Sequence, residues 1–190
     1  MKQSFRFAGC QIPVVEDKET NVRCAISAIS SACRKTGAKV VALPEMFSTP
    51  YDTKKFPVFA ESIPGPTSVS ISEAAKTCGC YVIAGSIPER DGSRVYNTCV
   101  CFAPDGSIVA KHRKLHLFEV ETTTIRFHES ETLTAGSDLT SFETPFGTIG
   151  VAICFDIRFP EVSRSLAIDR GCGFLRSEEH TSELQSRQVI

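Results

Sequence analysis

The stretch GVAICFDIRFPE, residues 150–161, joins an apolar run to the start of a helix and indicates the class of fold. The run before Cys154 is short and continuous, which is typical of a buried strand. Pro160 has a backbone suited to a first helical turn, so a helix is predicted from about Glu161 to Asp169. A strand that leads into a helix is typical of α/β proteins. Cys154 is left just beyond the predicted strand.

The first third of the chain repeats this alternation. The segment SFRFAGCQI, residues 4–12, has the pattern of a strand, and a helix closed by Gly37 follows it. Its predicted apolar face consists of Val22, Ile26, Ile29 and Cys33. The run AKVVALPE is then typical of a strand covered on both faces, which Pro44 ends before Glu45.

A second helix and several hairpins complete the pattern. Thr67 is the predicted N-cap of this helix, and Gly79 ends it before the strand CYVIAGSI, residues 80–87. Its predicted apolar stripe is Ile71, Ala74, Ala75 and Cys78. The turns Pro-Asp-Gly at 104–106 and Pro-Phe-Gly at 145–147 each separate two predicted strands. The fold class is therefore α/β, with a mixed sheet in one domain.

Composition excludes several classes of protein. The 190 residues are 42% hydrophobic, which is enough for a core, and the formal net charge of −1 favours neither nucleic acid nor an acidic membrane surface. The first residues do not resemble a signal peptide and no apolar stretch is long enough to span a membrane, so a cytoplasmic location is predicted. The nine cysteines, an odd number, are interpreted as reduced thiols.

The last fifteen residues, RSEEHTSELQSRQVI, match no pattern that precedes them. Their codons can be written so that they read as a short-read sequencing adapter, and we therefore predict that residues 176–190 are a non-native tail. The predicted domain is residues 1–175. The alternative is a polar C-terminal tail, and a longer transcript that continues with RSEEHTSELQS after Leu175 would establish that alternative.

Three polar or thiol side chains follow predicted strands: Glu45, Lys114 and Cys154. Ligands of α/β sheets collect beyond the carboxyl ends of the strands, so the three are expected to share a site. Each has a structural alternative. Glu45 could be a solvated loop acid, Lys114 part of a basic strand edge, and Cys154 a small core residue.

Together the three side chains suit amide hydrolysis. A cysteine supplies the strong nucleophile that a poorly electrophilic amide carbonyl requires, provided that a base or cation activates it. Glu45 could take the thiol proton and return it to departing ammonia. Lys114 could stabilise the thiolate and the oxyanion, and the N–H of Phe155 is the expected second oxyanion donor.

The segments LPEMF, HRKLHLF and GVAICFDIRFPE resemble the three signature segments of the nitrilase, or carbon-nitrogen hydrolase, superfamily. The resemblance covers Phe5 to Leu175 and implies Glu45 as general base, Lys114 as oxyanion stabiliser and Cys154 as nucleophile. It also implies a catalytic role for Glu129 in FHESETLTAG, although Glu131 stands close by. The implied fold is a four-layer α-β-β-α sandwich, incomplete here at the C-terminus, and the implied assembly is a homodimer or larger homo-oligomer.

Within the superfamily, the segments FSTPYDTKKFP, GSIPERDGSRVYNTCVCFAPDG and KLHLFEVE resemble the omega-amidase branch most. That branch removes ammonia from 2-oxoglutaramate and 2-oxosuccinamate without a cofactor and occurs in cytoplasm and mitochondria. A carboxylate remote from the scissile amide calls for a polar or cationic partner, and Tyr51 and Arg158 are the candidates. Either could be structural, Arg158 by pairing with Asp156.

Three other interpretations remain open. The chain could be a deaminated glutathione amidase or an N-carbamoylputrescine amidase, or it could be an inactive truncated fragment. We expect residues 1–190, expressed alone, to be poorly soluble and inactive, because surfaces that the family covers would be bare.

The remaining cysteines and histidines are given structural roles. Cys99 and Cys101 share a strand face and Cys78 and Cys80 flank a helix end, but neither pair has zinc spacing, so no metal site is predicted. The histidines of this group are His112, His116 and His128. A Cys-His mechanism with His116 as the base is the alternative to the glutamate.

Overall fold

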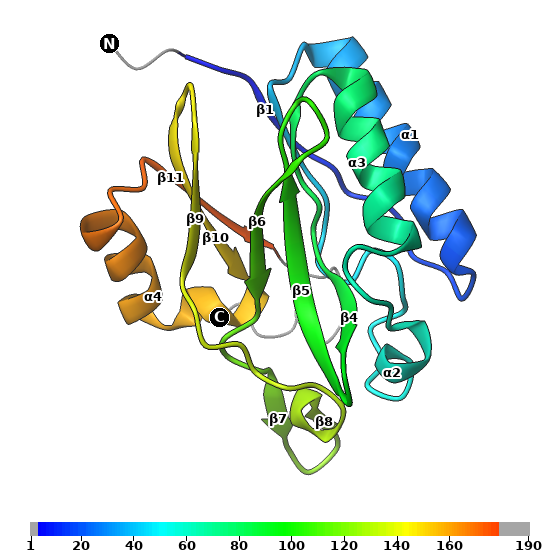
Figure 1. The fold of residues 1–190 in the computed structure, drawn as a ribbon. Coiled ribbons are helices and arrows are strands. Elements are labelled where there is room, and N and C mark those ends of the chain that lie inside the picture. The colour runs from blue at the N-terminus through cyan, green and yellow to red at the C-terminus, as the bar shows by residue number, and fades with distance from the viewer. Residues whose placement is uncertain (1–3, 179–190) are drawn as a thin grey trace.

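The structure, a computed structural model, describes residues 4–178 and has four layers. Helices α1 (Lys18–Thr36) and α3 (Pro66–Cys78) cover one face of a six-stranded sheet, and a three-stranded sheet packs on the other face (Figure 1). Helix α4 (Pro160–Arg164) covers the outer face of the smaller sheet. The predicted α-β-β-α sandwich is thereby confirmed.

The larger sheet has the order β1-β2-β3-β5-β4, with β6 also paired to β5. Strand β2 runs parallel to β1 and β3, whereas β5 runs antiparallel to β3, β4 and β6. The strands of this sheet are β1 (Phe7–Gly9), β2 (Val40–Ala42), β3 (Tyr81–Ile83), β4 (Ile87–Asp91), β5 (Arg94–Phe102) and β6 (Ile108–Arg113). The sheet is therefore mixed, as predicted.

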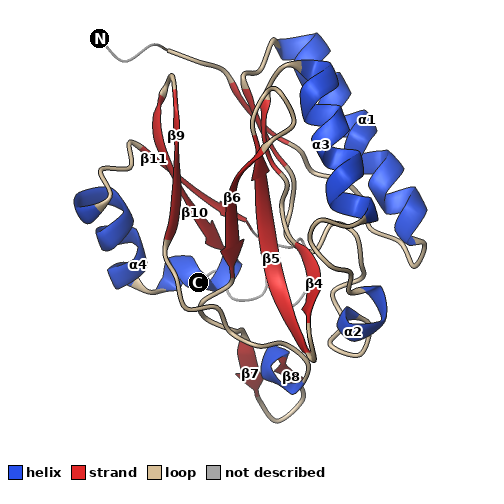
Figure 2. Cartoon of the chain, viewed as in Figure 1, coloured by secondary structure: helices blue, strands red, loops and turns tan. Residues whose placement is uncertain are grey.

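The smaller sheet has β10 at its centre, antiparallel to β9 and parallel to β11 (Figure 2). Two short strands, β7 and β8, form a hairpin at one end of the molecule, and the short helix α2 (Phe56–Phe59) lies near that end. The bounds of these strands are β7 (Glu119–Glu121), β8 (Arg126–His128), β9 (Thr140–Thr144), β10 (Gly147–Ile153) and β11 (Phe174–Glu178). Both predicted hairpin turns lie between strands, at β5–β6 and β9–β10.

Apolar side chains fill the space between the two sheets. Val40 and Ile83 of the larger sheet pack against Ile149 and Val151 of the smaller one, and all four are buried completely or to within 1%. Side chains of the opposite face, such as Val41, meet the helices instead. A strand with apolar residues on both faces is expected in an inner layer of such a sandwich.

The buried face of helix α1 differs slightly from the face that the pattern of apolar residues predicted. The fully buried positions are Asn21, Ala25 and Ile29, whereas Val22 is only half-buried. Asn21 is polar, but its side chain bonds the backbone N–H and C=O of Val15 at 2.8 and 2.7 Å, and this satisfies its polar atoms. The pattern of apolar residues alone could not show that contact.

The start of helix α3 corrects the prediction of Thr67 as its N-cap. Gly65 is the N-cap and Pro66 the first helical residue, while Ser68 Oγ accepts the Gly65 N–H at 2.8 Å. Thr67 lies inside the first turn because Glu61 accepts hydrogen bonds from both its N–H and its hydroxyl. A carboxylate from an adjoining segment therefore replaces the capping hydroxyl.

The predicted strand over residues 80–87 is wrong in its middle, where Ala84–Ser86 separates β3 from β4. Gly85 has φ +53°, and a Cβ at this position would lie 2.0 Å from the carbonyl oxygen of Pro44. The break places Ser86 where its hydroxyl accepts the N–H of Met46 at 3.0 Å. The loop that carries Glu45 is thus held from both sides.

The C-terminal elements differ from the prediction in two details. The third predicted helix corresponds to α4, which begins at Pro160. The second half of the predicted helix, Ser165–Asp169, is π-helical. Strand β11 runs through Phe174–Glu178 and so crosses the predicted end of the domain at Leu175. Residues 179–190, most of the predicted non-native tail, lie outside the described residues. Within residues 4–178, no helix is both long and apolar enough to cross a membrane.

Candidate active site

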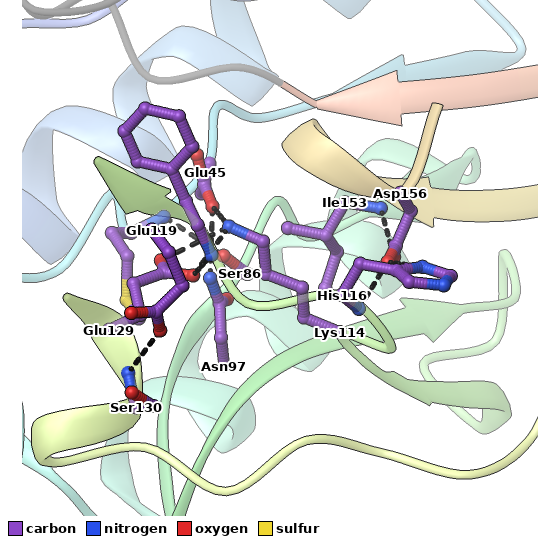
Figure 3. A network of polar contacts seen from close by, with 12 residues as sticks. Glu45, Ser86, Asn97, Lys114, His116, Glu119, Glu129, Ser130, Ile153 and Asp156 are labelled. Atoms are coloured by element: carbon purple, nitrogen blue, oxygen red, sulfur yellow. Dashed lines mark hydrogen bonds and ion pairs between the residues drawn. The ribbon is translucent and has the colours of Figure 1, made fainter. Parts of the chain in front are cut away.

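Three strand ends bring Glu45, Lys114 and Cys154 together in the interior. Glu45 follows β2 by three residues, Lys114 comes directly after β6, and Cys154 directly after β10. Their exposed fractions are 0%, 1% and 7%. The Lys114 ammonium donates to Glu45 Oε1 at 2.9 Å (Figure 3). The structural alternatives of a solvated loop acid and an exposed strand lysine therefore do not hold.

Glu129 is the fourth member of this cluster and is completely buried. It begins a 3₁₀ turn, Glu129–Glu131, and its carboxylate lies 2.9 Å from Lys114 Nζ. The hydroxyl of Tyr51 donates to Oε1 at 2.6 Å and the N–H of Phe118 to Oε2 at 2.7 Å. Glu131 is exposed and pairs with Arg126, so only Glu129 of the two acids reaches the site.

The charges of the cluster are unbalanced. Burial alone would lower the pKa of Lys114, but the charges of Glu45 and Glu129 outweigh burial and raise it, so the ammonium keeps its proton. Burial raises the pKa of Glu129, and Lys114 opposes that shift. One cation thus faces two carboxylates. A third negative charge in this space would be costly.

Cys154 therefore holds its proton at rest. Burial is the first cause that raises the pKa of its thiol above the ordinary value, the charge of Glu45 adds to it, and Lys114 opposes it. The sequence suggested that Lys114 stabilises a thiolate, but this ammonium is already shared by two carboxylates. The residue also has φ +48°, an uncommon backbone angle that tends to mark functional turns.

Asn97 of β5 also contacts Glu45 and was not found from the sequence. Its side-chain Nδ2 donates to Glu45 Oε1 at 2.9 Å, and its backbone carbonyl accepts the N–H of Lys114 at 2.9 Å. Within residues 4–178, no N–H or O–H donor reaches the other oxygen of Glu45, Oε2. An asparagine in the middle of a strand gives no sequence signal beyond its polarity.

Asp156 joins the turn after Cys154 to the loop after Lys114. Its carboxylate accepts the backbone N–H groups of Ile153, Leu115 and His116 at 2.8–3.0 Å. Its oxygens also lie 3.1 Å from ring nitrogens of His112 and His116. Burial would raise the pKa of Asp156, but the hydrogen bonds of His112 and Ile153 outweigh it and the pKa is lowered. A charged carboxylate thus holds the turn after Cys154 and the loop after Lys114 in register.

We expect Asp156→Asn to destabilise the complete enzyme, meaning the full-length protein that the family resemblance implies, by about 3 kcal/mol. One amide NH₂ would then face buried N–H groups and leave them without acceptors. Urea unfolding measures the change, and Asp138→Asn, at an exposed carboxylate, is the matched control with an expected change below about 0.5 kcal/mol. Equal stability of the two variants would show that the Asp156 contacts are dispensable.

The structural alternative for Arg158, a pairing with Asp156, does not hold. The Asp156 carboxylate is completely buried and is occupied by the backbone and histidine contacts, whereas Arg158 is exposed on the turn Cys154–Arg158. Tyr51 uses its hydroxyl proton on Glu129 and stacks on Phe127, with ring centroids 5.3 Å apart. Phe155 follows Cys154, and its ring packs edge-on against Phe118 and Phe159.

The histidines and remaining cysteines lie in structural surroundings. His116 contacts Asp156 and stacks on Phe159 with centroids 3.6 Å apart, so its imidazole is committed to the Asp156 contact rather than presented as a base. His128 pairs with Glu119. Cys99 and Cys101 are fully buried in the core between the sheets. Among residues 4–178 no three His, Cys, Asp or Glu side chains are arranged to hold a metal ion.

Comparisons with known proteins agree with the family resemblance of the sequence. The family described as carbon-nitrogen hydrolase matches residues 6–183. The chain is 48% identical to omega-amidase NIT2 of Xenopus tropicalis over 172 residues and 46% identical to omega-amidase NIT2 of Homo sapiens over 173. These alignments cover 90% of this chain and 62% of each relative, so the chain spans about three fifths of their length.

Solved structures show the same fold. Saccharomyces cerevisiae Nit3, a member of branch 10 of the nitrilase superfamily, superposes with a TM-score of 0.80 at 33% identity, over 93% of this chain and 64% of that one. Family, fold and the three separated signature segments therefore agree. This chain belongs to the carbon-nitrogen hydrolase family.

Proposed function

We propose that the complete enzyme is an omega-amidase. It hydrolyses the terminal amide of small dicarboxylic acid monoamides, 2-oxoglutaramate and 2-oxosuccinamate, to the acid and ammonia. The observation that carries the proposal is the buried cluster in which Lys114 bridges Glu45 and Glu129 beside the Cys154 thiol. The names of the relatives at 46–48% identity support the substrate class.

The first half of the reaction forms a thioester. The Cys154 sulfur attacks the amide carbon while its proton passes to Glu45, which prevents an additional negative charge from persisting in the cluster. Lys114 and the N–H of Phe155 stabilise the oxyanion, and one such donor contributes about 3 kcal/mol. Glu45 then returns the proton to the nitrogen, the carbon–nitrogen bond breaks, and ammonia leaves.

The second half hydrolyses the thioester. Water gives a proton to Glu45 as its oxygen bonds to the acyl carbon, and the same two donors stabilise the second oxyanion. The carbon–sulfur bond then breaks, the sulfur recovers the proton, and the carboxylic acid leaves. No electron transfer occurs, so the chemistry requires no redox cofactor.

The remote carboxylate of the substrate is proposed to bind Arg158, with Tyr51 lining the site. Arg158 is on the same 3₁₀ turn as Cys154, and a guanidinium matches the geometry of a carboxylate. The hydroxyl proton of Tyr51 is already donated to Glu129, so Tyr51 is suited to hold that glutamate or to accept from the substrate. The cytoplasmic or mitochondrial location and the homodimer remain predictions.

Two substrates discriminate the proposal from its alternatives within the family. We expect the complete enzyme to release ammonia from 2-oxoglutaramate at least about 100-fold faster, by kcat/KM, than from N-carbamoylputrescine, because a remote carboxylate and a remote amine need opposite partners. A glutamate dehydrogenase-coupled assay measures ammonia in both reactions. Faster turnover of N-carbamoylputrescine would assign the chain to that branch instead.

A further inference from the structure

We infer that Asn97 is a positioning residue for the general base: it occupies one oxygen of Glu45 and so directs the thiol proton to the other. This inference rests on the proposed function, because it assigns a task within the same site. Neither the signature segments nor the cluster of charged residues includes Asn97. It lies on β5, the strand that pairs with three others, and it is completely buried.

The contacts of Asn97 reach both charged partners. Its side chain donates to Glu45 Oε1 at 2.9 Å, and its backbone carbonyl accepts from the N–H of Lys114 at 2.9 Å. Lys114 Nζ donates to the same Glu45 oxygen at 2.9 Å (Figure 3). One strand residue therefore sets the place of the carboxylate and of the cation that shares it.

The two oxygens of Glu45 are consequently unequal. Oε1 accepts two donors, one of them charged, whereas Oε2 has no N–H or O–H donor among the described residues. Donors that contact an oxygen stabilise its negative charge and reduce its attraction for a proton. Oε2 is therefore the oxygen of Glu45 that remains open to accept a proton.

The orientation of the Asn97 amide supports a functional task. Its carbonyl oxygen Oδ1 is buried, and it too has no hydrogen-bond donor among residues 4–178. Turning the amide over would place Oδ1 against the Glu45 carboxylate, and two acceptors repel each other. The strand thus tolerates one unsatisfied carbonyl to keep a donor on Glu45. A buried polar atom without a hydrogen bond lowers stability, and such local losses of stability are typical of functional sites.

The titratable groups that face Glu45 are Lys114, Glu129, Cys154 and Tyr51. None of them is altered when Asn97 is replaced by leucine, which has nearly the same shape and no polar atoms. The substitution removes one donor from the carboxylate and so favours its protonated form. An inactive, protonated base would then persist to higher pH.

The experiment compares Asn97→Leu with Thr98→Val in the complete enzyme. Thr98 is the next residue of β5, is equally buried, and donates to a buried carboxylate, Glu89, that lies outside the cluster. For Asn97→Leu we expect kcat to fall about 10- to 100-fold with KM changed less than about threefold, and the acid limb of the pH profile to rise by about one unit. Thr98→Val should keep the profile of the unaltered enzyme.

A second readout separates this inference from the proposed substrate. The rate at which iodoacetamide alkylates Cys154, followed by mass spectrometry from pH 4 to 9, depends on the base beside the thiol and on no particular amide. Asn97→Leu should move its acid limb upward as well. An unmoved alkylation profile overturns the role of Asn97 even if 2-oxoglutaramate is hydrolysed. A moved profile supports that role even if another amide proves to be the substrate.

Discussion

Replacing Cys154 by alanine is expected to reduce ammonia release from 2-oxoglutaramate by about 10⁴-fold or more, because no thioester can form. Folding should persist. The substitution removes one sulfur from a residue that is 7% exposed, and alanine tolerates the φ of +48° no worse than cysteine does, so stability should change by about 1 kcal/mol or less. Initial rates and urea unfolding measure the two effects.

Cys101→Ala is the matched control for this variant. Cys101 is a fully buried thiol of the same size between the two sheets, and the reaction does not involve it. We expect it to lose stability and keep its turnover, the reverse of Cys154→Ala. Intact mass spectrometry of the complete enzyme, quenched during turnover, should show the acyl group on Cys154. Turnover that survives the loss of this thiol would refute the thioester mechanism.

The raised pKa of Cys154 predicts the pH dependence of its chemical reactivity. Alkylation assisted by Glu45 gives the acid limb described above, and direct ionisation of a thiol with a raised pKa adds to it, so the rate with iodoacetamide should keep increasing above about pH 8.5, the ordinary thiol value. A preformed thiolate would instead give a rate that reaches its plateau below about pH 7. Such an early plateau would contradict the proposal that the Cys154 thiol is protonated at rest.

The sequence was sufficient to predict that these side chains lie together because strand ends have strong local signals. Glu45 and Cys154 each follow an apolar run that the core requires, and the sheet topology then places both runs in facing layers. The contacts that arrange these side chains come from residues 44 to 52 positions away, such as Asn97 with Glu45 and Asp156 with His112. Polarity at one position does not reveal a partner so distant in the chain.

The errors of the prediction have the same origin. Thr67 has the residue type of an N-cap, but the Glu61 carboxylate occupies its donors, and a strand over 80–87 breaks where the Pro44 carbonyl approaches Gly85. Asp156 and Arg158 are near neighbours of opposite charge, and their pairing was the structural alternative for Arg158. Three backbone N–H groups donate hydrogen bonds to the Asp156 carboxylate instead. Local patterns thus predict elements well and tertiary hydrogen bonds poorly.

Lys114→Met is expected to abolish turnover and also to destabilise the complete enzyme by about 3–5 kcal/mol. Methionine keeps the length of the side chain but leaves the Glu45 and Glu129 carboxylates buried without their shared cation. Urea unfolding at pH 7.5 measures the loss. The control is Lys111→Met, which removes a partly exposed lysine whose partner Glu89 keeps Arg113, with an expected cost of about 1 kcal/mol or less.

The cause of this loss can be tested through pH and through a second substitution. Burial already raises the pKa of Glu129, and removing the opposing charge of Lys114 would raise it further. A folded pKa above the unfolded one favours the protonated folded state, so the deficit of Lys114→Met should be smaller at pH 5 than at pH 7.5. Adding Glu129→Gln should recover part of the stability and none of the turnover, because one buried charge is removed while the oxyanion donor stays absent. A deficit that is independent of pH and of Glu129 would mean that lost packing, rather than an unpaired carboxylate, destabilises the variant.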